Sequence, residues 1–139
     1  MNSLYNISIQ LYVIAIRFAA LFNAKSKLWI KGRKAIFQKI EQVIKGEQNI
    51  VWFHCASLGE FEQGKPIIEG YKQKYPSHKI LLTFFSPSGF EIRKNYEGAD
   101  WVFYLPADTK SNAKKFISIV KPIKVIFIKY EFWFNYMAE

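Results

Sequence analysis

The feature that most constrains the fold is a set of four short, continuously apolar segments in the second part of the chain. They are residues 50–55 (IVWFHC), 79–85 (KILLTFF), 100–105 (DWVFYL) and 125–130 (VIFIKY). Continuous rather than alternating hydrophobicity is typical of strands buried on both faces, as in parallel sheets covered by helices. The intervening stretches, at about residues 59–74, 89–96 and 109–120, are long enough for crossover helices. The sequence therefore predicts an α/β domain built on a parallel sheet.

Composition sets the size and class of the chain. Its 139 residues are the length of one ordinary domain, and 50% hydrophobic residues exclude intrinsic disorder. The single cysteine, Cys55, cannot form an internal disulfide, and two isolated histidines make no metal-ligand cluster. No GxGxxG follows the first apolar segment, so the dinucleotide-binding fingerprint is absent. We expect a protein of a reducing compartment, without structural zinc.

A long apolar stretch precedes the predicted sheet. Residues 4–22 (LYNISIQLYVIAIRFAALF) would form a helix about 28 Å long, close to the thickness of the hydrocarbon core of a bilayer. We expect a membrane-associated helix that either spans the bilayer or lies in its interface, and a core helix is the alternative. The first five residues carry no basic side chain, so a cleaved signal peptide is not expected.

The net charge of +9 is distributed unevenly. Residues 1–49 carry eight basic and two acidic side chains, a net +6, whereas residues 50–139 carry twelve and nine, a net +3. This placement indicates an anionic surface, phosphates or both, rather than a nucleic-acid partner. By the positive-inside rule, the basic cluster that follows the apolar stretch holds the chain on the cytoplasmic side of the membrane. The cluster consists of Lys25, Lys27, Lys31, Arg33, Lys34 and Lys39.

These patterns divide the chain into three parts. Residues 1–23 are the predicted membrane anchor helix, residues 24–49 a basic amphipathic linker helix, and residues 50–139 the α/β domain. Within the linker, residues 34–45 place apolar side chains at helical spacing. This predicts an amphipathic helix that packs on the domain or rests on lipid.

The loop after the first predicted strand, HCASLGE, holds the first candidate site, because open parallel sheets bind ligands at the carboxyl ends of their strands. Ser57 and Glu60 have the spacing of a capping box, in which each side chain satisfies a backbone N–H of the new helix. A carboxylate at this place can also act as a general base, and Gly59 lets a ligand approach the backbone. Both interpretations of Glu60 remain open.

The next two loops also combine helix-start and ligand-binding features. In FFSPSG, Ser86, Pro87 and Gly89 predict either a plain helix start or an anion site made of backbone N–H groups. In LPAD, Asp108 is expected to be the N-cap of the following helix.

Taken in order, the loop motifs are more specific than any one of them alone. They are HxxSxGE (His54, Ser57, Gly59, Glu60), TxxSPSG (Thr83, Ser86, Pro87, Ser88, Gly89), LPxD (Leu105, Pro106, Asp108) and YEFWFN (residues 130–135). This series resembles the N-terminal domain of the 3-deoxy-D-manno-octulosonic acid (Kdo) transferases, the glycosyltransferases that attach Kdo to the lipid A precursor of lipopolysaccharide. The resemblance covers essentially the whole chain.

The resemblance implies an inverting, metal-independent GT-B enzyme with two Rossmann-like domains, of which this chain is the N-terminal, acceptor-binding one. It implies CMP-Kdo as donor substrate and no cofactor. The acceptor would be a phosphorylated, acylated disaccharide at the cytoplasmic face of the inner membrane. Glu60 corresponds to the proposed catalytic base, and Glu131 to an acidic residue with a supporting role. The other predicted substrate-binding residues are Ser57, Gly59, Ser86, Ser88, Gly89 and Asp108.

The chain departs from the common family pattern in three places. SerProSerGly replaces ThrPxxGly in the second loop, and Lys129 stands where a first carboxylate is common, which puts the role of that carboxylate in doubt. The chain also stops at Glu139, with no donor-binding domain, so we expect a fragment that binds acceptor without transferring Kdo. The alternatives are a different GT-B glycosyltransferase and a non-catalytic, membrane-tethered α/β binding module.

Overall fold

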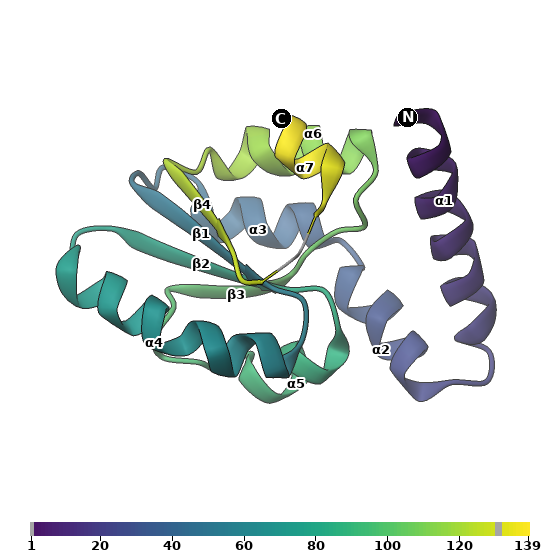
Figure 1. Ribbon diagram of the computed structural model, residues 1–139, viewed down its shortest axis with the longest axis horizontal. Helices are drawn as coiled ribbons and strands as arrows, with labels where there is room; N and C mark the ends of the chain where they lie inside the picture. The colour runs from purple at the N-terminus through teal and green to yellow at the C-terminus, as the bar shows by residue number, and fades with distance from the viewer. Residues whose placement is uncertain (1, 130–131) are drawn as a thin grey trace.

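The computed structural model describes residues 2–129 and 132–139, and it shows one parallel sheet flanked by helices (Figure 1). The strands pair in the order β3-β2-β1-β4, and every pairing is parallel. Their bounds are β1 Ile50–Cys55, β2 Lys79–Phe84, β3 Trp101–Tyr104 and β4 Lys124–Phe127. The predicted Rossmann-like α/β fold with a parallel sheet is therefore confirmed.

Helices cover both faces of the sheet (Figure 1). One face carries α4 (Leu58–Lys74) and α5 (Pro87–Arg93). The opposite face carries α3 (Ile36–Ile44), α6 (Lys110–Val120) and α7 (Phe134–Ala138). Because side chains alternate along a strand, β1 supplies Phe53 to the core under α4 and Trp52 to the core under α6. The chain thus builds two apolar layers around one central strand.

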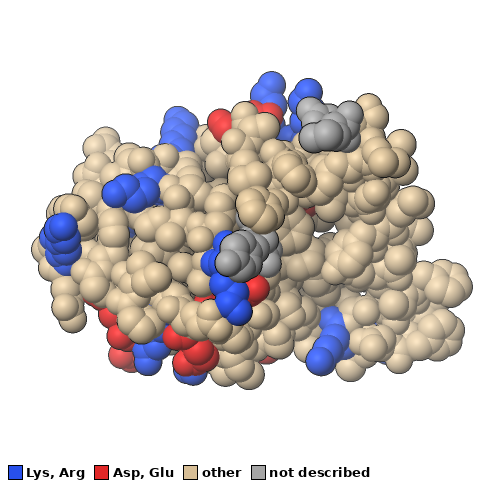
Figure 2. All heavy atoms as spheres, in the orientation of Figure 1, with Lys and Arg blue, Asp and Glu red and all other residues tan. Residues whose placement is uncertain are grey.

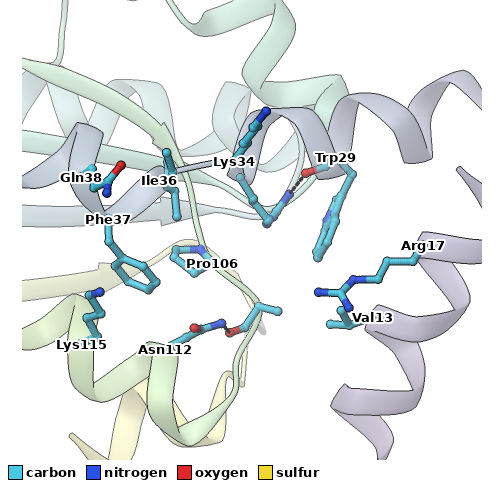
Figure 3. Close-up of a pocket in the computed structure, with 13 residues that line it drawn as sticks. Val13, Arg17, Trp29, Lys34, Ile36, Phe37, Gln38, Pro106, Asn112 and Lys115 are labelled. Atoms are coloured by element: carbon cyan, nitrogen blue, oxygen red, sulfur yellow. Dashed lines mark hydrogen bonds between the residues drawn. The ribbon is translucent and has the colours of Figure 1, made fainter.

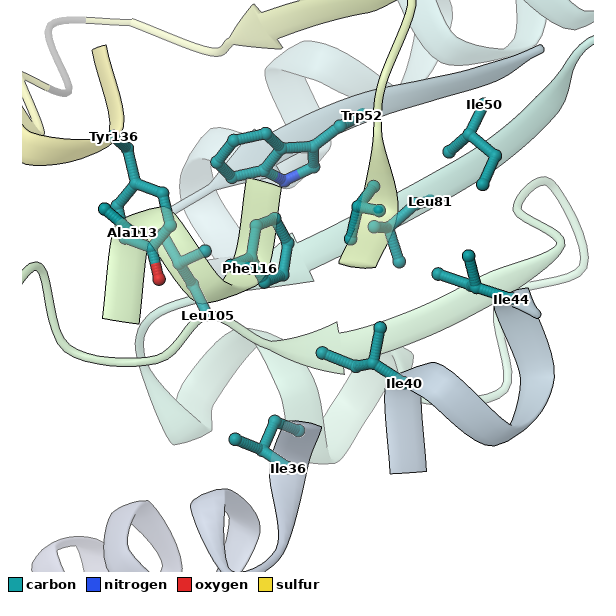
Figure 4. Close-up of a cluster of buried hydrophobic side chains, with 11 residues drawn as sticks. Ile36, Ile40, Ile44, Ile50, Trp52, Leu81, Leu105, Ala113, Phe116 and Tyr136 are labelled. Carbon is teal, nitrogen blue, oxygen red and sulfur yellow. The ribbon is translucent and has the colours of Figure 1, made fainter. Parts of the chain in front are cut away.

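The core on the α3 and α6 side is built around Trp52 (Figure 4). Its ring centroid lies 4.8 Å from that of Phe116 on α6 and 5.5 Å from that of Tyr136 on α7. Helix α3 adds a buried stripe at helical spacing, formed by Ile36, Ile40 and Ile44. Of the two expectations for residues 34–45, packing on the domain is therefore the one observed.

The strands differ in how deeply they are buried. Every residue of β1 is buried, as predicted for a central strand. Strand β4 ends at Phe127 rather than at residue 130, and its Lys124 and Val125 are exposed. The expectation that all four strands are buried on both faces is wrong for β4, and β3 is only half-buried over its first three residues. Both strands lie at the edges of the sheet.

The predicted anchor forms α1 (Asn2–Ala19), and a second helix, α2 (Ala24–Arg33), follows after a turn. Asn23 caps α2 by accepting a hydrogen bond from the Ser26 N–H. Within the described part of the chain, no helix is by itself long and apolar enough to cross a bilayer. The pair α1–α2, bent by 119°, meets those criteria only when both helices are taken together. The two helices lie at the right of Figure 1, with α1 outermost.

Close packing of α5 on β2 depends on Gly89. A Cβ atom built at this position would lie 2.3 Å from a ring carbon of the fully buried Phe84. We expect Gly89→Ala to lower the free energy of unfolding in urea by about 1–3 kcal/mol, the usual cost of overpacking a core. Gly70→Ala is the matched control, because a Cβ there meets no atom within 4 Å. This exposed helical alanine should stabilise the chain by about 0.5–1 kcal/mol. Equal effects of the two changes would disprove the packing role.

Candidate functional site

Buried polar side chains organise the carboxyl edge of the sheet. His54, at the end of β1, places Nδ1 2.9 Å from the Thr83 hydroxyl and 3.1 Å from the Thr83 carbonyl oxygen. The Trp133 indole N–H donates to His54 Nε2 over 3.1 Å. An indole nitrogen only donates, so we assign the histidine proton to Nδ1. Burial lowers the pKa of His54 to about 3, and the ring is therefore a neutral structural link rather than an acid or base.

Arg33, the last residue of α2, hydrogen-bonds to the chain directly after the carboxyl ends of β2 and β3. Its guanidinium donates from Nε to the Leu105 carbonyl and from Nη2 to the Phe85 carbonyl, both over 2.8 Å. It also donates from Nη1 to the Trp29 carbonyl over 3.2 Å, and it lies 3.8 Å from the centroid of the Trp29 ring. Burial lowers the pKa of Arg33 to about 9, so the group remains charged at neutral pH.

Arg33 belongs to the basic cluster that follows the apolar stretch, and the structure gives it an additional structural role. Three of its N–H groups donate to carbonyl groups of the protein. The local sequence does hold a signal for this arrangement, because Gly32 lies directly before it. A Cβ at Gly32 would lie 2.1 Å from the Tyr104 ring, so glycine allows α2 to approach β3 closely.

Glu60 lies at the start of α4, where its Oε2 accepts the Ser57 backbone N–H over 2.7 Å and the Ser57 hydroxyl over 3.1 Å. The predicted capping box between Ser57 and Glu60 is therefore confirmed. Both donors reach the same oxygen, and Oε1 has no hydrogen bond among the described residues. Gly59 is exposed, with open space around it. A general-base role for Glu60 stays a prediction.

The loop after β2 lies next to the loop after β1. The Ser86 N–H donates to the Ala56 carbonyl oxygen over 2.7 Å, which ties the two loops together. Ser86 is the N-cap of α5, Pro87 occupies the first helical turn, and the Ser86 and Ser88 hydroxyls lie 2.9 Å apart. The helix start is thus confirmed, and anion binding by this loop stays a prediction.

Asp108 is not the N-cap of α6, which begins with Thr109 as its cap. The carboxylate instead caps α7, accepting the backbone N–H groups of Asn135 (3.1 Å) and Tyr136 (3.0 Å). It also accepts the Tyr5 hydroxyl over 2.5 Å. Burial, reinforced by Asp108, raises the pKa of Tyr5. The N-cap expectation fails because Asp108, only 1% exposed, points into the protein. Its predicted substrate contact stays a prediction.

With this geometry in place, the comparisons with known proteins identify the family. A family model described as "3-Deoxy-D-manno-octulosonic-acid transferase (kdotransferase)" matches residues 17–139. The chain belongs to this family. The match covers the capping box of Glu60, the Ser86 loop and Asp108.

Similar transferases come from several bacteria. The 3-deoxy-D-manno-octulosonic acid transferase of Aquifex aeolicus is 35% identical over 101 residues, which is 72% of this chain and 27% of the relative. That of Chlamydia trachomatis serovar D is 31% identical over 127 residues, 89% of this chain and 28% of the relative. That of Haemophilus influenzae is 31% identical over 90 residues, 64% of this chain and 21% of the relative. The chain spans about a quarter of the length of these relatives.

The remaining family positions lie near the C-terminus. Glu131, predicted to support catalysis, lies outside the described residues. Lys129, at the position of a common family carboxylate, is exposed and has a left-handed backbone conformation with φ 66°. Among residues 2–129 and 132–139, no three His, Cys, Asp or Glu side chains gather in a way that could hold a metal ion.

The Tyr5–Asp108 hydrogen bond ties α1 to the domain, and its removal should release the start of that helix. We expect Tyr5→Phe to weaken docking of α1 by about 1.5–3 kcal/mol, the usual worth of a hydrogen bond to a charged group. Amide hydrogen exchange of α1, measured in mild detergent, should accelerate by at least about tenfold. Ser8→Ala is the control, since that hydroxyl donates only to the Leu4 carbonyl of the same helix. Unchanged exchange in Tyr5→Phe would show that other contacts hold α1.

Proposed function

We propose that this chain is the acceptor-binding part of an inverting, metal-independent GT-B glycosyltransferase that transfers Kdo from CMP-Kdo to the lipid A precursor. The family match over residues 17–139 carries this proposal. It favours Kdo transfer over the other GT-B reactions and over the non-catalytic module considered from the sequence. Because the family's second domain holds most of the donor, the chain alone should bind acceptor without transferring Kdo.

The first loop supplies the chemistry in this proposal. An inverting transfer needs a base that removes the proton of the acceptor hydroxyl as the oxygen attacks the donor. Glu60 suits this task because Ser57 holds Oε2 in place, and Oε1 is left without a protein donor among the described residues. Since Gly59 is exposed beside it, a sugar hydroxyl has room to approach the carboxylate.

The neighbouring loop would position the acceptor. Ser86 and Ser88 present two hydroxyls next to the Glu60 loop, and the Ser86–Ala56 hydrogen bond fixes the spacing of the two loops. Hydroxyls and backbone N–H groups suit the polar face of a phosphorylated sugar. Glu131 is proposed to support the reaction.

Helix α1 would hold the enzyme at the membrane where its acceptor resides. Its outward face is an apolar stripe, which we define as Leu4, Ile7, Leu11, Ile14 and Phe18, each between 52% and 74% exposed. Figure 2 shows the α1 edge of the molecule, at right, almost free of charged atoms, with basic atoms near the bend towards α2. The inward face hydrogen-bonds to the domain through Tyr5 and Asn6. A helix that packs one face against the protein is more consistent with lying in the membrane interface than with spanning the bilayer.

The membrane role of the stripe can be tested without disturbing the fold. We expect Leu11→Ser combined with Ile14→Ser to lower the fraction of chain that co-sediments with phosphatidylglycerol-phosphatidylethanolamine vesicles by at least about tenfold. Each buried side chain of this size contributes about 1.5–3 kcal/mol. Ile67→Ser combined with Ile123→Ser is the control, because both residues are similarly exposed but lie outside α1. An equal loss of vesicle binding in both double variants would rule out α1 as the membrane contact.

The catalytic role of Glu60 is tested in a full-length transferase that carries this chain. Glu60→Gln preserves an oxygen that can accept the Ser57 N–H, but the amide cannot take up a proton. We expect turnover to fall by roughly 100- to 10,000-fold, the usual contribution of a general base, with little change in melting temperature.

Ser57→Ala is the matched control for this change. It should cost about 1 kcal/mol of stability as a cap substitution and reduce turnover much less. A Glu60→Gln enzyme that retains more than about a tenth of the wild-type rate would leave Glu60 with its capping role alone. Glu131 would then be the next candidate for the base.

A further inference from the structure

A hollow of about 590 Å³ lies on the side of the molecule opposite α4, where α1, α2, α3 and α6 approach the loop after β3 (Figure 3). Arg17 reaches into it from α1, and Lys115 lies across from it on α6, beside Phe37. Pro106 and Asn112 lie between these two basic residues in the view. The hollow is distinct from the Glu60 loop, because none of its lining residues belongs to the loops after β1 and β2.

The charge of this hollow is of one sign. Four basic residues line it, Arg17, Arg33, Lys34 and Lys115, and no described acidic residue does. The ion pairs of the described chain lie elsewhere and involve other lysines and Arg93. Like charges gathered in a concave site repel one another and attract anions. The hollow therefore concentrates positive charge that nothing in the described part of the chain neutralises.

Arg33 has hydrogen-bonding capacity to spare at this hollow. Arginine has five N–H donors, and Arg33 uses three of them on the carbonyls of Trp29, Phe85 and Leu105, which leaves two. The Trp29 ring lies against the guanidinium, 3.8 Å from centroid to Cζ, and is only 7% exposed. The ring therefore holds the Arg33 guanidinium in place at the wall of the hollow.

The lining also determines what kind of anion fits. The volume lies within the usual range for organic ligands and exceeds the needs of a lone phosphate ion. Apolar side chains, Val13, Ile36 and Phe37, share the wall with the basic ones. Val13 and Arg17 also lie next in sequence to Ile14 and Phe18 of the exposed stripe of α1. A ligand with an anionic head and an apolar body matches this combination.

We infer that this hollow binds a phosphate group carried on a larger, partly apolar molecule, with Arg17, Arg33 and Lys115 around the phosphate. The inference rests on the hollow itself and does not depend on the transferase reaction. Two sources share this chemistry, the phosphate headgroup of a membrane lipid and a soluble phosphate ester.

Isothermal titration of the purified chain in mild detergent tests the inference. The probes are dihexanoyl phosphatidic acid, dihexanoylglycerol, glucosamine 6-phosphate and inorganic phosphate. We expect a phosphate-bearing probe to bind, and Arg17→Gln combined with Lys115→Gln to weaken its binding at least tenfold. Lys110→Gln combined with Lys114→Gln is the matched control, since it removes the same charge from exposed positions outside the hollow. This control should bind as the unaltered chain does, and melting curves should show that both double variants fold.

Each outcome decides the question. Phosphatidic acid binding without glucosamine 6-phosphate binding would assign the site to lipid headgroups, and comparable binding of both would assign it to phosphate esters in general. Absence of binding by all three phosphate probes would overturn the inference. Equally weakened binding in the two double variants would show that net charge alone attracts the phosphate. Equal binding of dihexanoylglycerol and phosphatidic acid would show that apolar contact alone holds the probe. Either result would also overturn the inference.

Discussion

The guanidinium of Arg33 is the contact on which the carboxyl edge of this domain depends. The last carbonyl groups of parallel strands lack further partners within the sheet, and Arg33 satisfies those of Phe85 and Leu105 at once. In doing so it fixes α2 against the ends of β2 and β3. Its charge is accommodated by the faces of Trp29, Phe85 and Tyr104 rather than by a carboxylate. One cation thus joins the N-terminal helices to the sheet.

The aromatic rings around Arg33 extend this connection to the other loops. Phe85 stacks on Tyr12 of α1 and packs against Trp133, with ring centroids 6.0 Å and 4.6 Å away. Trp133 in turn donates to His54 at the end of β1. Helix α1 is held at its other end by Asp108, which also caps α7. Helix α1 and the loops after β1 and β2 are therefore parts of one packed edge.

The two candidate ligand sites use this edge differently. The Glu60 loop presents a carboxylate oxygen beside an exposed glycine, which suits proton transfer from a sugar hydroxyl. The hollow between α1 and α6 presents only positive charge and apolar walls. In the two proposals, separate sites for the reacting hydroxyl and for an anionic group would allow binding energy to be gained away from the chemistry. Such remote contacts are a general means of orienting a substrate.

Local patterns in the sequence determined the central strand and the starts of α4 and α5. The bounds of β1 follow from the unbroken run IVWFHC, and the start of α4 follows from the Ser57–Glu60 spacing, because both depend on residues that are neighbours in the chain. Tertiary structure alone decided the rest. Asp108 meets Tyr5 across 103 residues, and Arg33 meets Leu105 across 72. Sequence periodicity does not predict such pairs, because the hydrogen-bond partner of a buried polar group depends on which distant residues the fold brings next to it.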